Sequence, residues 1–426
     1  MNEPELTTRR EFLHKGLSLI CVGATVPTFL QRSALALDDP RDVRLTRSRP
    51  GVPEDRILVV VQLAGGNDGL NTLVPFHSDA YYRARPTLAI PADQVIKLDA
   101  ELGFHPAAVG LKSLYDDGHL CVVQQVGYPN PNRSHFRSMD IWHTASPDGR
   151  LHEGWIGRYF DNCCRGEPDP KAGIALTAEA PLALRGQKFA PIAFSRPEML
   201  NLRPVDGRMA TRSAIASLNR PDAERKDGPP VSTLDFLTRT ALDAQVAADD
   251  IRRAAARDDG ARFPESQLSQ SLRTVSRLIA ANLPTRVYFV SLSGFDTHAR
   301  QANRHRQLLE QLGQALQAFI QALAKQGNLG RTLVMTFSEF GRRVAENGSA
   351  GTDHGEAAPM FLLGGDVRAG LCGPTPQLEN LNRGDLPFAI DFRQVYAAVL
   401  SDWLGADATR LLGGRFDPPD IFRATP

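Results

Sequence analysis

The feature that most constrains the fold is a series of short, continuous apolar runs rich in β-branched residues. They lie at 57–63, 120–126, 286–292, 331–337 and 359–363. Continuous rather than alternating runs of this length are typical of strands buried on both faces, as in a parallel sheet. Helical stretches lie between several of them, at 106–114, at 134–145 and after residue 298, where leucines recur at helical spacing. This order predicts an α/β fold, a three-layer αβα sandwich with a mostly parallel central sheet.

The part of the chain from 150 to 285 interrupts this alternation. It contains Glu-Pro-Asp-Pro and Gly-Pro-Pro turns, and two amphipathic stretches, 233–256 and 266–281, that predict helices. We interpret this part as an insertion or cap rather than an independent domain. Residues 37–426 are therefore expected to form a single domain.

The N-terminal segment predicts export. A paired arginine at 9–10 is followed by Phe12-Leu13, which is typical of a twin-arginine signal. The apolar stretch 16–30 is too short for a comfortable membrane span, and the Ala-Leu-Ala sequence at 34–36 fits a leader-peptidase site. We expect 1–36 to be a signal peptide recognised by the twin-arginine export machinery, leaving a folded periplasmic or secreted protein with no stable membrane span. The alternative is an amphipathic helix in which the two arginines occur by chance.

Composition and short motifs exclude several classes of function. The chain carries 49 basic and 48 acidic residues, whereas a polyanion-binding protein needs a large basic excess, so we expect no nucleic-acid partner. The five cysteines contain no CxxC pair, which argues against a zinc ribbon, a thioredoxin-type site and c-type haem. No GxGxxG sequence opens a helix, so a dinucleotide cofactor is not indicated.

Polar residues follow the strands at the points where the chain leaves the predicted sheet. These residues are Asp68, Ser134, Asp296, His298, Glu339, Asp353 and His354. Open α/β sheets bind ligands at the carboxyl edge of their strands, so loops distant in sequence can meet there. Carboxylates and imidazoles are metal ligands, and the side chains of Asp296 and His298, two residues apart in extended backbone, point the same way. The pattern predicts a divalent metal site.

Ser134 is predicted at the start of a helix. There its hydroxyl meets unpaired N–H groups and the positive end of the helix dipole, which favours an alkoxide nucleophile and an anionic ester. Each candidate also has a structural explanation when taken alone. Ser134 could be an N-cap, Asp68 a turn residue, and Glu339 a cap or an ion-pair partner of Arg342 or Arg343. Asp296 and His298 could be a hydrogen-bonded loop pair, and Asp353-His354 a surface turn. We expect His135, on the same helix, to be a packing or polar-face residue.

A family resemblance rests on five short motifs. They are Gly-Gly-Asn-Asp-Gly-Leu-Asn at 65–71, Ser-His-Phe-Arg-Ser-Met-Asp at 134–140, Phe-Asp-Thr-His at 295–298, Ser-Glu-Phe-Gly-Arg at 338–342 and Thr-Asp-His-Gly at 352–355. In this order they resemble an exported family of unknown function, domain of unknown function 1501, which is placed in the alkaline phosphatase/sulfatase superfamily. The resemblance covers most of the chain after the signal and implies an alkaline-phosphatase-like fold.

The resemblance also implies roles for individual residues. Ser134 matches the nucleophile, Asp296, His298 and His354 match one metal site, and Asp68 matches the metal aspartate of the first strand. The sequence departs from the superfamily at Phe340, where the second site ordinarily has a histidine. That second site then contains only oxygen ligands, from Asp68, Ser134, Glu339 and Asp353, which suit calcium, magnesium or manganese better than zinc. We expect one or two divalent ions.

These inferences favour an exported, metal-dependent hydrolase of phosphate or sulfate esters. Ser134 attacks the ester, and Asn67, Arg133 or Arg342 hold its anionic oxygens. A different hypothesis is a non-catalytic metal-binding or assembly protein with a protein partner, which the incomplete metal set supports. A third is a redox enzyme exported with an organic cofactor.

Overall fold

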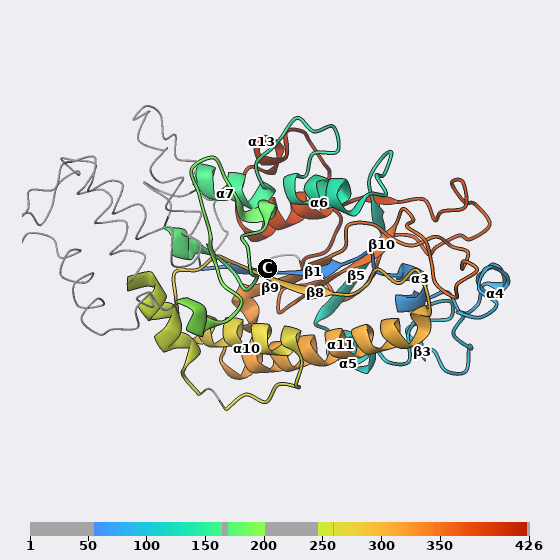
Figure 1. Cartoon of the computed structure of the whole chain (residues 1–426), viewed down its shortest axis with the longest axis horizontal. Helices are drawn as coiled ribbons and strands as arrows, with labels where there is room; N and C mark the ends of the chain where they lie inside the picture. Colours follow the sequence, from blue (N-terminus) through green and yellow to red (C-terminus); the bar gives the residue numbers. More distant parts are fainter. Residues whose placement is uncertain (1–54, 164–168, 201–245, 259, 424–426) are drawn as a thin grey trace, which may run out of the picture. The chain divides into compact units, whose positions relative to one another are not determined.

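The computed structural model describes residues 55–163, 169–200, 246–258 and 260–423 (Figure 1). They fall into two compact units, of which the larger contains the described residues of 43–195 and 257–426. The smaller unit is described only at 196–200, which includes the 3-10 turn η4 (Pro197–Leu200), and at 246–256, most of which is helical. The predicted signal peptide and the first part of the predicted 233–256 helix lie outside the described residues. The predicted insertion, 150–285, contributes to both units.

The larger unit is built around one sheet, whose strands run in the order β11-β5-β10-β9-β1-β8-β6-β7, with β12 also pairing to β5. The strands are β1 (Ile57–Ala64), β5 (Leu120–Gly127), β6 (Gly173–Ala175), β7 (Ile192–Ala193), β8 (Val287–Ser293), β9 (Thr332–Phe337), β10 (Ala358–Gly364), β11 (Gly370–Cys372) and β12 (Ile390–Asp391). Only β10 runs antiparallel to its neighbours among these described strands. Every residue of β5, β9 and β10 is buried, as their continuous apolar sequences predict.

Helices cover both faces of the sheet (Figure 1). On one face lie α5 (Val109–Asp116), α10 (Gln267–Ala280) and α11 (Gln301–Lys325), and on the other α6 (His135–Thr144), α7 (Trp155–Cys163), α12 (Phe392–Ala398) and α13 (Ala408–Leu412). A π-helical turn, Val399–Trp403, continues α12. The three-layer αβα prediction is therefore confirmed. No helix of the described residues is long and apolar enough to cross a membrane.

Aromatic side chains fill the core between the sheet and the α6 layer. Trp142 of α6 stacks on Phe392 of α12 with ring centroids 4.3 Å apart, and Trp155 of α7 stacks on Tyr396 at the same distance. Such contacts contribute about 0.5–1.5 kcal/mol each beyond their buried area. Trp142 also stacks on Phe337 of β9 with ring centroids 5.7 Å apart, so α6, which begins at the candidate site, packs against the sheet.

Short elements complete the unit around the end of β1. They are α3 (Gly69–Thr72), β2 (Leu73–Val74), α4 (Asp79–Ala84), β3 (Ile96–Lys97) and β4 (Gly103–Phe104), with 3-10 turns η2 (Pro170–Ala172), η3 (Leu182–Leu184) and η5 (Leu329–Arg331) elsewhere. β2, β4 and β3 form a small antiparallel sheet. Two- and three-residue strands carry no sequence period, which explains why the hydrophobic pattern did not indicate them.

The strand register brings distant loops to one edge of the sheet. The last residues of β1 and β8, Ala64 and Ser293, pair directly, and β9 ends beside β1. Because β10 is antiparallel, its first residue, Ala358, lies at the same edge, opposite Val126 near the end of β5. The loops that follow β1, β5, β8 and β9 and the loop that precedes β10 therefore meet.

Candidate metal centre

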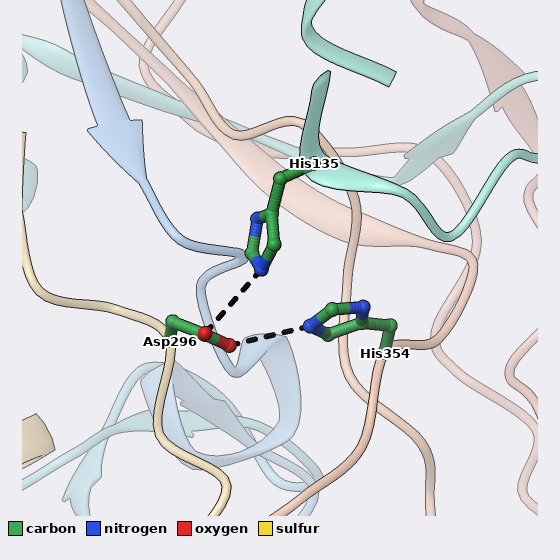
Figure 2. Close-up of side chains that lie close together, drawn as sticks. All are labelled: His135, Asp296 and His354. Carbon is green, nitrogen blue, oxygen red and sulfur yellow. Dashed lines mark hydrogen bonds and ion pairs between the residues drawn. The ribbon is translucent and has the colours of Figure 1, made fainter. Parts of the chain in front are cut away.

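Three histidine side chains converge on the carboxylate of Asp296. Asp296 and His298 follow β8, His135 is the first residue of α6, and His354 precedes β10. The Nε2 atoms of His298 and His354 lie 3.1 and 3.2 Å from Asp296 Oδ1, and Nε2 of His135 lies 3.4 Å from Oδ2. Figure 2 shows the rings of His135 and His354 directed at the carboxylate of Asp296. The ligand atoms of these last three residues lie within 4.8 Å of one another.

The other ring nitrogen of each histidine faces an oxygen acceptor. The acceptors are Glu339 Oε1 for His135 (3.0 Å), Asp353 Oδ1 for His298 (3.0 Å) and the backbone oxygen of Arg133 for His354 (2.7 Å). A carboxylate or a carbonyl oxygen accepts but does not donate, so each Nδ1 carries a hydrogen. In the neutral ring, Nε2 then presents a lone pair toward Asp296.

This arrangement suits a cation. The Nε2 atoms of His298 and His354 lie only 2.9 Å apart. Two lone pairs facing each other beside an ionised carboxylate repel one another unless a proton or a metal ion lies between them. Metal-bound histidines characteristically donate their second N–H to a carboxylate or a backbone carbonyl, as all three do here. His135, His354 and Asp296 therefore fit a divalent metal ion, with two imidazoles and one carboxylate as ligands and His298 beside them.

Electrostatics keep this set in its ligating form. Burial raises the pKa of Asp296, but the hydrogen bond and the positive charge of Arg342 lead the contributions that outweigh burial and lower the pKa to about 2. Burial lowers the pKa of His354, which favours its neutral form. The side chains of Asp296 and His298 are 46% and 43% exposed. A centre open to solvent resembles catalytic rather than closed structural metal sites.

Arg342 lies beneath the centre and is fully enclosed. Its guanidinium donates to backbone oxygens of three loops, among them Gly66 (2.8 Å), Thr352 (2.7 Å) and Phe295 (2.9 Å), and to Asp296 Oδ1 (2.8 Å). The structure therefore places this predicted substrate-binding residue behind Asp296, where it orients the carboxylate and ties together the loops that carry the ligands.

Asp68 and Asn67 are fully buried and belong to a different network. Asp68 Oδ2 accepts hydrogen bonds from Arg85 Nη1 (2.6 Å) and from Gln301, and Asp68 caps the backbone N–H of Asn71. Burial raises the pKa of Asp68, but the Arg85 charge and its hydrogen bond lower it below its usual value. In the described part of the chain, the side chain of Asp68 bonds to none of the residues of the metal centre. The Arg85 guanidinium supplies the positive charge that a second metal ion would supply.

Glu339 and Asp353, both predicted as metal ligands, lie behind the histidines instead. Besides holding His135, Glu339 Oε1 accepts from the backbone N–H of Gly65 (2.7 Å). Asp353 holds His298, and its pKa is lowered chiefly by that hydrogen bond. Both carboxylates thus orient histidine rings, and the second oxygen of Glu339, Oε2, is buried without a hydrogen-bond partner among the described residues.

Ser134 lies between two residues that contact the centre. It is the exposed N-cap of α6, and its hydroxyl makes no capping bond; its backbone N–H donates to Asn132 Oδ1. Its neighbours are His135 and Arg133, whose backbone oxygen holds His354. The structure thus brings Ser134 and Arg133 to the rim of the same centre.

His135 is the candidate ligand that sequence reasoning missed. We expected a packing or polar-face residue because the position looked like any other in the first turn of a helix. Its place directly after Ser134, at the edge where the other ligands gather, is the signal that could have identified it.

A family model for a "Protein of unknown function (DUF1501)" matches residues 55–385. The chain belongs to this family. A comparison with curated proteins finds no match.

Solved structures similar to this chain include the lipoteichoic acid synthase LtaP from Listeria monocytogenes, at 11% identity and a TM-score of 0.36, covering 87% of this chain and 80% of that one. The C-terminal periplasmic domain of EcEptC from Escherichia coli in complex with Zn matches at 8% identity and a TM-score of 0.35, covering 75% of this chain and 76% of that one. A protein in the alkaline phosphatase superfamily from Vibrio parahaemolyticus matches at 10% identity and a TM-score of 0.37, covering 92% of this chain and 78% of that one. With identities near 10% and TM-scores below 0.5, functional conclusions for this chain come from its own site.

Proposed function

We propose that this protein is an exported, metal-dependent hydrolase of phosphate or sulfate esters, acting in the periplasm or outside the cell. The observation that carries the proposal is the convergence of three histidine Nε2 atoms on Asp296 at a solvent-open edge of the sheet. We further propose that the site holds one ion, zinc, because two imidazoles and one carboxylate are a typical catalytic zinc set that leaves a coordination position open.

Ser134 is the proposed nucleophile. Its hydroxyl is exposed, is not used as a helix cap, and lies at the positive end of α6, next to the ligand His135. When bound, a divalent ion supplies Lewis acidity that favours an ionised hydroxyl and offsets charge on the ester oxygens. The chain itself supplies the attacking oxygen and, for the anionic ester, the N–H groups of the first turn of α6.

The test compares two helix N-cap serines. Ser266 caps α10 by accepting from the backbone N–H of Ser269, whereas Ser134 makes no such bond. We expect Ser134→Ala to abolish turnover of 4-nitrophenyl phosphate and 4-nitrophenyl sulfate, with little change in stability. We expect Ser266→Ala to keep turnover but lose about 1 kcal/mol of stability.

Two results decide against the proposal. If metal-free protein binds no zinc when zinc is added, the proposed metal centre is wrong. Zinc-loaded protein that turns over no ester in a broad panel contradicts the hydrolase and favours the alternative, a non-catalytic metal-binding or assembly protein. Asp68 is already ion-paired with Arg85, so it is not free to bind a second metal ion. The described residues then offer one set of metal ligands, and this keeps the non-catalytic alternative open.

A further inference from the structure

A tight turn carries an acidic residue toward the metal centre. Asn382 and Asp385 bond each other's backbones in both directions, at 2.9 and 3.0 Å. The central residues, Arg383 and Gly384, have φ angles of 53° and 87°, which are typical of a type I′ turn. Glu356, just before β10, accepts a hydrogen bond from the Asn382 side chain at 3.1 Å. The turn is therefore held in place on the segment that also carries His354.

Two arginines flank the Asp385 carboxylate. Arg133 Nη2 donates to Asp385 Oδ2, and Arg343 Nε lies 3.5 Å from Asp385 Oδ1. The side chain of Asp385 is 2% exposed, but those of Arg133 and Arg343 are 45% and 35% exposed. The carboxylate is covered, whereas both guanidinium groups reach solvent.

The turn is shaped to receive Arg343. Its Nη2 donates to the backbone oxygen of Arg383. A Cβ atom added at Gly384 would lie 2.6 Å from that same Nη2, so a side chain there would displace the guanidinium. The turn and the guanidinium of Arg343 are therefore in direct contact.

Both arginines are fixed to the metal centre through their backbones. The backbone oxygen of Arg133 holds His354 Nδ1 at 2.7 Å. The backbone N–H of Arg343 donates to the oxygen of Asp353, the residue that holds His298, at 2.9 Å. The arginine pair and the metal ligands thus belong to one rigid arrangement.

The pair carries one uncompensated positive charge, since two guanidinium groups face one carboxylate. Among the described residues, Nη1 of Arg133 and Nη1 of Arg343 have no hydrogen-bond partner, so donors remain for a ligand. A clamp that only fastened the turn would need one arginine. Two partly exposed arginines with spare donors are suited to an oxyanion, which guanidinium groups bind through paired, charge-assisted hydrogen bonds.

We propose that Arg133 and Arg343 form an anion subsite beside the metal centre, and that the substrate carries a second anionic group besides the ester that reacts. The second group is a phosphate, sulfate or carboxylate on the same molecule. This inference rests on the proposed function, because it places the reacting ester at the metal.

The experiment compares two non-hydrolysable probes by calorimetry on the full-length, zinc-loaded protein. Phenylphosphonate offers one anionic group, and 3- or 4-carboxyphenylphosphonate adds a second. We expect the carboxylate to tighten binding roughly tenfold, as one charge-assisted contact would. Arg343→Gln should reduce this preference to about twofold or less while phenylphosphonate affinity changes little. Arg343→Lys keeps the positive charge but lacks the paired N–H donors of a guanidinium group, so it should retain an intermediate preference. This variant also controls for loss of folding in Arg343→Gln.

The control is Arg415→Gln. Arg415 also pairs with an aspartate, Asp417, at 3.1 Å, on an exposed surface, and its loss should leave the preference unchanged. Equal affinity for all probes in the wild type, or an undiminished preference in Arg343→Gln, would overturn the subsite while leaving the hydrolase intact. Failure of phenylphosphonate to bind the zinc-loaded protein would instead contradict the proposed function and the subsite with it.

Discussion

At the scale of single residues, the candidate centre depends on oxygen acceptors that hold its histidine rings. Glu339 is the clearest case: its carboxylate is 2% exposed, and one oxygen holds both His135 and the backbone of the loop after β1. Such an acceptor fixes the tautomer and the ring orientation of the ligand and raises its basicity.

We therefore predict that Glu339→Gln weakens zinc binding on the order of 10- to 100-fold, because the neutral amide no longer supports the His135 imidazole as a carboxylate does. Competition with a chelating dye measures the affinity. Glu346→Gln is the matched control, since Glu346 also accepts backbone N–H groups, from Thr87 and Leu88, but holds no histidine. Zinc affinity equal to wild type in Glu339→Gln would remove His135 from the ligand set.

The sequence could place candidate residues at this edge but could not assign their roles. Strand order and residue type were sufficient to gather Asp296, His298 and His354, because the carboxyl ends of parallel strands meet. Whether Glu339 or its neighbour His135 reaches the ion depends on side-chain directions that only the packed structure determines. The same holds for Asp68, whose partners Arg85 and Gln301 lie far along the chain.

At the scale of elements, buried strands were predictable because burial on both faces produces continuous apolar sequence. The predicted runs and the observed β1, β5, β8, β9 and β10 agree to within one or two residues at each end. Short edge strands such as β7 and β11 lack any such signal. Their positions follow from pairing with a sheet that already exists.

Helix α6 carries a histidine whose burial has a consequence for stability. His143 packs against Phe289 and Phe337, with ring centroids 6.0 and 5.8 Å away, and burial lowers its pKa to about 4. The unfolded chain takes up a proton on this residue near its ordinary pKa of 6.5, whereas the folded protein does not until about pH 4. Between these values the unfolded state binds more protons, so stability falls as pH falls.

The wild type loses free energy of unfolding between pH 7 and pH 5. By the same linkage relation, we predict that this loss is smaller by roughly 2 kcal/mol in His143→Phe. Urea unfolding at the two pH values measures this difference. His77→Phe, which replaces an exposed histidine, should leave the pH dependence as it is. An unchanged pH dependence in His143→Phe would mean that this imidazole is protonated equally in the folded and unfolded states.

At the scale of the whole molecule, one ion would join segments that are distant in sequence. Its ligands come from the start of α6, the loop after β8 and the segment before β10. The family resemblance implies a second metal position at Asp68. There the carboxylate of Asp68 is already paired with the buried guanidinium of Arg85, at 2.6 Å. Removing one partner of a buried pair typically costs 3–5 kcal/mol because the other charge is left uncompensated.

We therefore predict about one zinc ion per chain, and different responses from two variants. Ligand binding stabilises a folded state by about 2.7 kcal/mol at a hundredfold excess over Kd, so saturating zinc should raise the melting temperature of the chelator-treated wild type by roughly 5 °C. His354→Ala should lose both the bound zinc and this response. Asp68→Asn should keep one zinc and the response but melt at a lower temperature throughout, because Arg85 is left buried without its partner. Two zinc ions in the wild type and one in Asp68→Asn would instead show that Asp68 exchanges its arginine for a metal.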